Sequence, residues 1–378
     1  MRSRVVAMAA GLLMVLGPSE VFAQATAFEV QAERSDLLQF VPRPDSRKRL
    51  DFGVWDATLK EIVFYGGPTL RVRAPAAAPG IGSRLVRAHD SAYRLDGNRV
   101  MFELLNDEGK AGLAGYVRDL EEIANTRDLP RFPRDEQLAF WLNLHNAIVV
   151  AEIAQAYRVQ RPSRLRNKAG ESFHDAPRVT IQGVQLSLRD IREGIVYANW
   201  RDPLVIYGFF QGDIGSPSLS REAFTGRRVW EQLRREGGNY ANGLRGFDTT
   251  FGPARVSEVY WNAAPWLFPS FERDVRAHLK TLLDEELQNE LDAYEKPLKR
   301  VPYEKTVADM TGGFGIQYGE GQDALTGVRR NNFSDFVREH VEKRLEIRRR
   351  GLVDGTVTIE DIPTVDPDLP PEDKIAGE

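Results

Sequence analysis

Residues 135–150 constrain the fold of this chain more than any other stretch. They read DEQLAFWLNLHNAIVV, and their large apolar residues recur at helical spacing on two faces, with Leu138, Trp141 and Leu142 on one and Phe140 and Leu144 on the other. A helix that is apolar on most sides has to be packed on most sides. We therefore predict a buried helix that begins at residue 135 and runs to about residue 157.

This helix also carries Asn143, His145 and Asn146, whose polar groups need partners. A buried polar group without a hydrogen-bond partner costs about 1–3 kcal/mol. These side chains are therefore expected either to join neighbouring segments or to line a site. A lone histidine on a packed helix face is more often a hydrogen-bonded core residue than a catalytic base.

The rest of the chain predicts a fold of the α+β or mixed α/β class. Apolar residues recur at helical spacing within 50–63, 111–126, 188–196, 229–244, 271–294 and 331–350. The turn sequence at 96–98 predicts a hairpin over 93–102, and the apolar run 203–210 predicts a buried strand that leads into a glycine-containing loop. We expect one main domain, predominantly helical, with a small buried mixed sheet.

The first residues predict export. Arg2 and Arg4 precede the apolar run 5–16, and small residues follow at 21 and 23, which is the pattern of a secretory signal peptide at 1–23. A membrane anchor is the alternative, but it needs about 20 apolar residues. We see no later stretch of that length and expect no stable membrane span after cleavage. The chain has no cysteine, which excludes disulfides and a thiol nucleophile and favours a periplasmic or secreted protein of a Gram-negative bacterium.

Composition divides the remainder of the chain. We predict an N-terminal extension at 24–49, a main domain at 50–275, a C-terminal helical extension packed on it at 276–363, and a disordered acidic tail at 364–378. The net charge of −4 gives no electrostatic reason to expect a nucleic-acid partner. The basic segment 158–168 is interpreted as a solvated loop, with an anionic-ligand patch as the alternative. No aromatic residue is interleaved in it, which counts against nucleic-acid stacking.

Four blocks of sequence resemble a known family. They are FWLNLHNA at 140–147, QGVQLSLRDIREGI at 182–195, DPLVIY at 202–207 and QGDIGSPSL at 211–219. In order and spacing they are similar to the blocks of the domain-of-unknown-function 547 family, and weaker likeness extends over roughly 50–275. Where many relatives have Ser-Cys-Pro, this chain has Gly215, Ser216 and Pro217, and His145 stands where they often have an aromatic residue. The resemblance implies no settled activity.

One hypothesis is a hydrolase or acyl-transfer enzyme of the cell envelope. Ser216 would be the nucleophile, with His145 or His174 as its base. Asp213, Asp175 or Asn146 would orient that base, and backbone N–H groups of 212–216 would form an oxyanion hole. The chain lacks a G-x-S-x-G elbow, and Ser-Pro is also a common turn pair, so Ser216 could serve only to shape a turn.

The other hypothesis is a non-catalytic envelope module that binds a small molecule, peptide, glycan or other envelope component. It explains the missing thiol without a substitute, and Tyr240, Tyr260, Trp261 and Trp266 could supply an aromatic platform or could be core residues. Under either hypothesis the predicted pocket lies between the histidine-bearing helix and loop 211–219. Besides the catalytic candidates, its predicted ligand-binding residues are Trp141, Asn143, Asn146, Gln211, Gly212 and Gly215.

No cofactor is expected. The five histidines are far apart in sequence, with neither a zinc motif nor a cysteine partner, and we predict no metal site. A site assembled by folding from His145, His174 and Asp175 is the alternative that the sequence leaves open.

Overall fold

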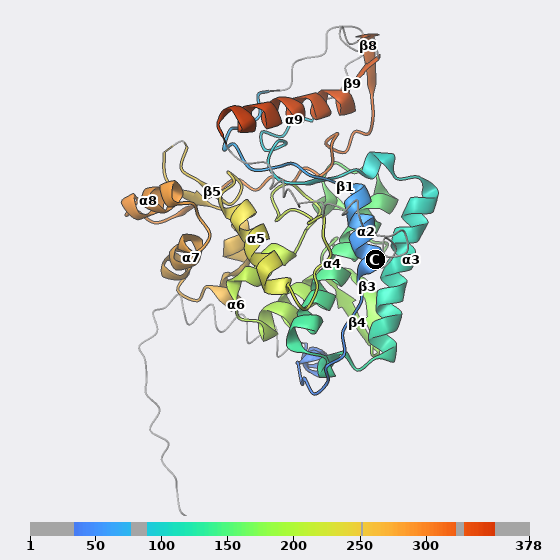
Figure 1. Ribbon diagram of the computed structural model, residues 1–378. Helices are drawn as coiled ribbons and strands as arrows, with labels where there is room; N and C mark the ends of the chain where they lie inside the picture. The colour runs from blue at the N-terminus through green and yellow to red at the C-terminus, as the bar shows by residue number, and fades with distance from the viewer. Residues whose placement is uncertain (1–33, 77–88, 251, 323–328, 352–378) are drawn as a thin grey trace, which may run out of the picture.

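The computed structural model describes residues 34–76, 89–250, 252–322 and 329–351 (Figure 1), with the side chains of 320–330 left out. The predicted signal peptide at 1–23 and acidic tail at 364–378 lie outside the described residues, as does the start of the predicted N-terminal extension.

Helices make up most of the regular structure. The α-helices are α2 (Gly53–Ile62), α3 (Asp107–Thr126), α4 (Arg134–Ala156), α5 (Val229–Ala241), α6 (Glu258–Leu267), α7 (Phe271–Lys280), α8 (Glu285–Ala293) and α9 (Asn332–Arg349). Short 3-10 helices are η1 (Ser35–Phe40), η2 (Phe102–Leu104), η3 (Leu129–Arg131), η4 (Pro162–Arg164) and η6 (Pro203–Gly208), and η5 (Asp190–Tyr197) is a π-helix.

The strands are short and form separate small sheets. They are β1 (Val63–Phe64), β2 (Arg99–Val100), β3 (Pro177–Ile181), β4 (Val184–Ser187), β5 (Phe247–Asp248), β6 (Arg255–Val256), β7 (Lys299–Arg300), β8 (Tyr318–Gln322) and β9 (Arg329–Asn331). The pairs β1–β2, β3–β4 and β8–β9 are antiparallel, whereas β5–β6–β7 is mixed, antiparallel between β5 and β6 and parallel between β6 and β7. The predicted helix-rich α+β fold with a small mixed sheet is confirmed.

Helix α4 is the central element, as predicted. It lies in the middle of the fold with α3 alongside it (Figure 1), and from Glu136 to Ala151 every residue is buried. The helix starts one residue before the predicted start, and Pro133, which makes no side-chain cap, precedes it. Asp135 lies in the first turn, where its carboxylate accepts a 2.9 Å hydrogen bond from the indole Nε1 of Trp230.

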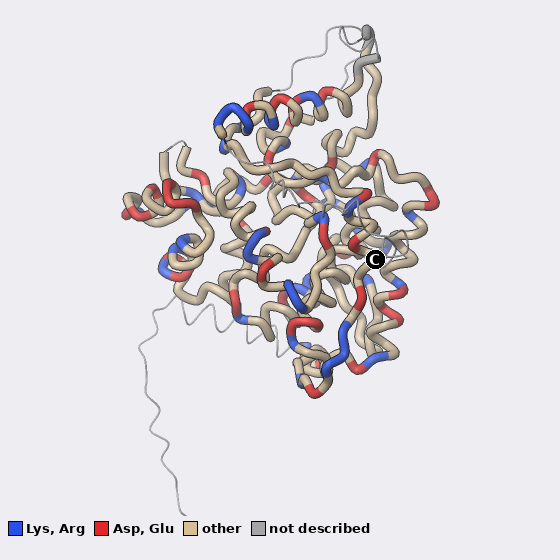
Figure 2. Tube along the Cα trace, viewed as in Figure 1, with Lys and Arg blue, Asp and Glu red and all other residues tan. Residues whose placement is uncertain are grey.

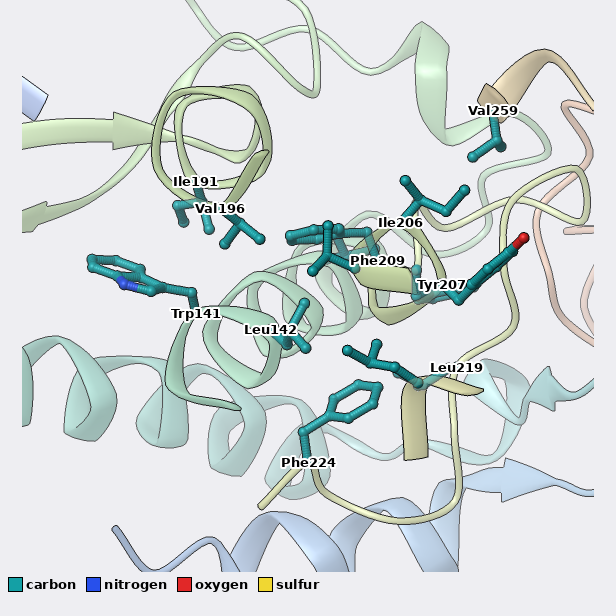
Figure 3. Close-up of a cluster of buried hydrophobic side chains, with 14 of the residues drawn as sticks. Trp141, Leu142, Ile191, Val196, Ile206, Tyr207, Phe209, Leu219, Phe224 and Val259 are labelled. Carbon is teal, nitrogen blue, oxygen red and sulfur yellow. The ribbon is translucent and has the colours of Figure 1, made fainter. Parts of the chain in front are cut away.

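The core continues from α4 to η5 and η6. Figure 3 shows Ile191 and Val196 pointing from η5 toward Trp141 and Leu142 of α4, with Phe209 between the two elements. All five side chains are at most 1% exposed. This packing fixes one face of η5, so the other face of that helix is held in place beside α6.

Three elements differ from the sequence-based prediction. The apolar spacing within 271–294 predicts one helix, but the chain there forms two, α7 and α8. The apolar run 203–210 does not form a strand: Pro203 starts the 3-10 helix η6, and the Asp202 carboxylate accepts a hydrogen bond from the Leu204 N–H at 2.9 Å. The predicted hairpin over 93–102 is also wrong, because Arg99 and Val100 pair with β1 instead. In 203–210 and in the predicted hairpin 93–102, the backbone N–H and C=O groups bond to partners that the local spacing of apolar residues does not predict.

The chain after α8 returns across the body of the fold. Gly215 donates from its N–H to the Glu304 carbonyl at 2.8 Å, and Ala308 donates to the Gly212 carbonyl at 3.0 Å. Helix α9 is tied to the rest by a 2.7 Å ion pair between Arg94 and Glu339. Figure 2 shows acidic and basic residues interspersed along the trace, with basic residues at the C-terminal end of α9, where cations suit exposed carbonyls.

Candidate functional site

Helix α4 and the start of the glycine loop are in direct contact, as the sequence predicts. The Asn146 side chain donates to the Gly208 carbonyl at 2.9 Å and accepts from the Phe210 N–H at 3.1 Å. Gly212 has a positive φ of 92°, and a Cβ there would lie 2.4 Å from Cδ1 of Ile153. The junction between helix and loop is therefore filled by packing, and the amide of Asn146 joins two segments.

The other polar and aromatic residues predicted on this helix face are also enclosed. Asn143 donates to the Phe224 carbonyl at 2.8 Å and accepts from the Phe224 N–H at 3.0 Å. Trp141 is 1% exposed and packs edge-on against Phe40 and Phe140. Each of these side chains holds the helix to its neighbours.

Ser216 is fully buried, and the hydrogen bonds of its hydroxyl among the described residues are with main-chain atoms. The Oγ accepts from the Gln211 N–H at 3.1 Å and donates to the Asp213 carbonyl at 2.8 Å. These bonds close a compact turn. The structure thus does not join the Ser216 hydroxyl to either candidate histidine by a hydrogen bond.

Asp213 and Gly215 lie in the same turn, under the returning chain. The Asp213 carboxylate accepts the Tyr303 hydroxyl at 2.8 Å and the Ser216 N–H at 3.1 Å, both at Oδ1. Burial raises the pKa of Asp213 to about 7, although the bond from Tyr303 acts in the opposite direction. Gly215 is buried, and its carbonyl accepts the Tyr240 hydroxyl at 2.6 Å.

His145 is fully buried, edge-on to Phe209 with ring centroids 4.8 Å apart. Its Nδ1 lies 3.3 Å from the Asn146 amide oxygen, which can only accept, so Nδ1 carries the proton. The Nε2 atom is then an acceptor with no partner among the described residues. Burial first, and then the charge of Arg192, hold the pKa of His145 well below its usual value.

An open cleft lies on the far side of η5, between that helix and α6. We call it the η5–α6 cleft, and its volume is about 470 Å³, within the range of roughly 300–1,000 Å³ common for small-molecule sites. Its lining residues come from η5, α6 and two loops: His174, Arg189, Arg192, Glu193, Tyr197, Gln211, Val259, Trp261, Asn262, Pro265 and Trp266.

Four polar atoms on the lining residues have no hydrogen-bond partner in the described part of the chain. They are one guanidinium nitrogen (Nη1) of Arg192, the Nδ1 of His174 and the indole Nε1 atoms of Trp261 and Trp266. These atoms are closed off from bulk solvent. Buried polar groups are nearly always hydrogen-bonded, so four unpartnered atoms on the residues of one cleft make it the candidate site.

The charged groups of the cleft are held in place. Arg192 is 8% exposed and donates from Nη2 to Oε1 of Glu193 at 2.6 Å, while Nη1 of Arg189 lies 4.0 Å from the other oxygen of Glu193. Burial acts to lower the pKa of Arg192, but Glu193 outweighs it and the pKa is raised. Arg189 is also paired with Asp175 at 2.5 Å, so each arginine of the lining has a carboxylate beside it, while Nη1 of Arg192 keeps no partner of its own among the described residues.

His174 is partly exposed, but its environment keeps the ring neutral. Burial is the largest cause and the charge of Arg192 the next, and together they lower the pKa of His174 to about 3 against the opposing effect of Asp175. A neutral imidazole offers one donor and one acceptor to an occupant of the cleft.

The wall of the cleft depends on the irregular helix η5. The Ser187 hydroxyl accepts from the Asp190 N–H at 3.1 Å at the start of this segment, and the turns that follow are wider than those of an α-helix. Such turns occur often at functional sites. On the opposite wall, Trp261 stacks on Phe271 with centroids 3.7 Å apart, under the guanidinium of Arg300.

The structure divides the predicted site residues into three groups. His174, Gln211, Trp261 and Trp266 line the η5–α6 cleft, Asp175 is exposed and paired with Arg189, and the other candidates are buried. Sequence reasoning missed the other seven lining residues, which are Arg189, Arg192, Glu193, Tyr197, Val259, Asn262 and Pro265. No signal in the sequence marked Arg192 and Glu193, because an α-helical projection of 188–196 places Arg192 between Leu188 and Val196 on the apolar side and Glu193 on the polar side, and neither position indicates a cleft.

Within the described ranges, no group of three or more histidine or acidic side chains is placed to hold a metal ion. None of the helices in those ranges combines the length and apolarity that a bilayer span requires.

Comparison with known proteins gives one match. Residues 129–240 fit the model of a family described as "Protein of unknown function, DUF547". This range holds α4, the β3–β4 hairpin, η5 and the glycine loop, but it ends before α6, which forms the second wall of the cleft. No curated protein and no solved structure matches the chain.

Proposed function

We propose that this protein, which belongs to the DUF547 family through residues 129–240, is a non-catalytic binding module that holds a small anionic ligand in the η5–α6 cleft. The observation that carries the proposal is the set of unpartnered polar atoms on the residues that line that cleft, Nη1 of Arg192 among them. A bound ligand would supply the partners that the protein itself does not.

The environment of Ser216 supports binding over the hydrolase or acyl-transfer alternative. A serine nucleophile needs an accessible hydroxyl within hydrogen-bond reach of a base. Ser216 is 0% exposed and its hydroxyl is engaged by the main chain of the loop. His145 is equally enclosed, and its proton is directed to Asn146.

The proposal is tested by a ligand screen on the purified protein. Thermal unfolding is measured with a panel of small carboxylates, phosphate esters, amines, neutral sugars and short peptides, each added at several concentrations. A ligand that binds only the folded state raises the unfolding temperature in proportion to the logarithm of its concentration. We expect stabilisation from anionic members of the panel and none from amines.

Two variants separate the cleft from the loop in this screen. Trp261→Phe removes one indole N–H from the cleft while it keeps the ring stack on Phe271, and Ser216→Ala alters only the loop. Ligand-induced stabilisation should shrink in Trp261→Phe and persist in Ser216→Ala. Ester or peptide hydrolysis by the wild type that Ser216→Ala abolishes would overturn the proposal in favour of the enzyme.

Export is part of the same proposal. It rests on the charged, apolar and small-residue pattern of residues 1–23, which predicts a periplasmic or secreted protein. The amino-terminal sequence of the protein recovered from the producing cell tests it: a start at Gln24 is the expected result, and a retained Met1 would contradict it.

A further inference from the structure

The unpartnered groups of the η5–α6 cleft restrict the hydrogen-bonding character of its occupant. Arg192 Nη1 and the indole nitrogens of Trp261 and Trp266 are donors only. An amine would present further donors to them, and a hydrocarbon would present nothing. An occupant that satisfies all three groups must carry several acceptor oxygens.

The charges of the lining restrict the net charge of that occupant. Glu193 is paired with both arginines, at 2.6 Å to Arg192 and 4.0 Å to Arg189, so its carboxylate is committed within the wall. Arg189 is also paired with Asp175 at 2.5 Å, so the wall as a whole is close to neutral, and a monoanion at Arg192 suits it better than a phosphate ester, whose charge approaches −2 near neutral pH. A carboxylate has the matching charge, and its planar pair of oxygens suits a guanidinium nitrogen.

The remaining lining groups restrict the body of the ligand. Gln211 and Asn262 carry amides that both donate and accept, as hydroxyl groups do. They lie with two tryptophans in a space of about 470 Å³. A small body with several hydroxyl groups meets these amides and the indole N–H groups, whereas a long apolar chain does not.

We infer that the η5–α6 cleft takes an oxygen-rich carboxylic acid of the uronic-acid type, with its carboxylate at Arg192 and hydroxyl oxygens at the tryptophan N–H groups. This inference rests on the proposed function, since it names the ligand class of the same cleft. The donor atoms are closed off from solvent, so the side chains of the cleft part as the ligand enters.

Isothermal titration of the purified protein at pH 7 tests the ligand class with three matched probes. D-Glucuronate carries the carboxylate, D-glucose has the same ring without charge, and D-glucose 6-phosphate replaces the planar monoanion with a tetrahedral, more highly charged group. A hydrogen bond to a charged group changes affinity by roughly tenfold or more. We therefore expect glucuronate to bind at least about 10-fold more tightly than either other probe.

Tryptophan variants test the position of the ligand. Trp261→Phe and Trp266→Phe each remove one donor N–H from the cleft, and each should weaken glucuronate binding by roughly 2- to 10-fold. Trp200→Phe is the matched control, because its indole nitrogen is also buried and unpartnered but Trp200 does not line the cleft. That variant should bind glucuronate as the wild type does.

The results of these titrations test the ligand class and the proposed function separately. Equal affinity for glucose and glucuronate, or tighter binding of the phosphate ester, overturns the uronic-acid assignment and leaves a binding cleft. If none of the three sugars binds but other anions stabilise the protein in the screen, the uronic-acid assignment is also wrong and a binding cleft is left. If neither the sugars nor any anion of the screen binds, both the assignment and the proposed function are wrong.

Discussion

The substitution Asp213→Asn gives a test of the loop in which the size and sign of the effect follow from the structure. Asp213 is 3% exposed, and burial raises its pKa from 3.8 to about 7. The folded protein therefore holds a proton on this carboxyl over a pH range in which the unfolded chain has lost it. Its contribution to stability is fully present below pH 4 and is lost as the pH rises through 7.

The expected magnitude follows from that shift. One pKa unit corresponds to about 1.4 kcal/mol. The free energy of unfolding of the wild type should therefore fall by about 2–3 kcal/mol between pH 5 and pH 8 because of this group. Asparagine keeps an oxygen that can accept from both Tyr303 and Ser216, since the two bonds meet at the same atom. The free energy of unfolding of Asp213→Asn, relative to that of the wild type, should thus increase by about 2–3 kcal/mol as the pH rises from 5 to 8.

Urea unfolding of both proteins, followed by tryptophan fluorescence at pH 5 and pH 8, measures this difference. Asp248→Asn is the control: Asp248 is 1% exposed, but its pKa is lowered, so it is ionised in both states throughout this range and its effect should not change with pH. The reasoning would be refuted if the difference in free energy of unfolding between Asp213→Asn and the wild type were the same at pH 5 and at pH 8. That result would mean that Asp213 is ionised in the fold, as a carboxylate that orients a catalytic base would be.

Two further substitutions test the packed junction of loop and helix. Ser216→Ala leaves the Gln211 N–H without its acceptor and should lower the free energy of unfolding by about 1–3 kcal/mol, as urea unfolding would measure. Asn146→Ala leaves the Gly208 carbonyl and the Phe210 N–H unpaired and should cost about 2–5 kcal/mol in the same assay. A loss below about 0.5 kcal/mol in either case would contradict the assigned contacts.

The sequence predicted the helices well because their signal is local. The alternation of apolar and polar residues at helical spacing specifies α2, α4 and α9 to within a few residues. Helix α3 begins earlier than predicted, at Asp107, because Asn106 caps it by accepting from the Gly109 N–H at 2.8 Å. Nothing in the apolar spacing marks such a cap.

Elements that depend on distant partners were predicted less well. The run at 203–210 is apolar and β-branched, but Asp202 and Pro203 favour a 3-10 turn at its start, and the surrounding core makes the run buried in either conformation. Arg99 donates to the carbonyls of Tyr93 and Asn98, so the segment before β2 folds back on itself and β2 is left to pair with β1. Spacing along the chain does not encode these choices.

The candidate site likewise has one part that the sequence predicted and one part that it did not. The contact of α4 with the loop followed from amides in an apolar helix, and Asn146 makes that contact. The position of the open cleft did not follow, because it depends on how η5 and α6 meet. The π-turns that carry Arg192 to this wall have no signature in the spacing of apolar residues.

The tryptophan indole N–H signals in a ¹H–¹⁵N NMR spectrum test the central claim most directly. Each signal is assigned by the matching Trp→Phe variant, and D-glucuronate is then added in steps. The account predicts that the signals of Trp261 and Trp266 move with the ligand concentration while those of Trp200 and Trp230 stay in place. Movement of Trp200 and Trp230 alone, or of none of the four with any anion that stabilises the protein, would contradict a binding site between η5 and α6.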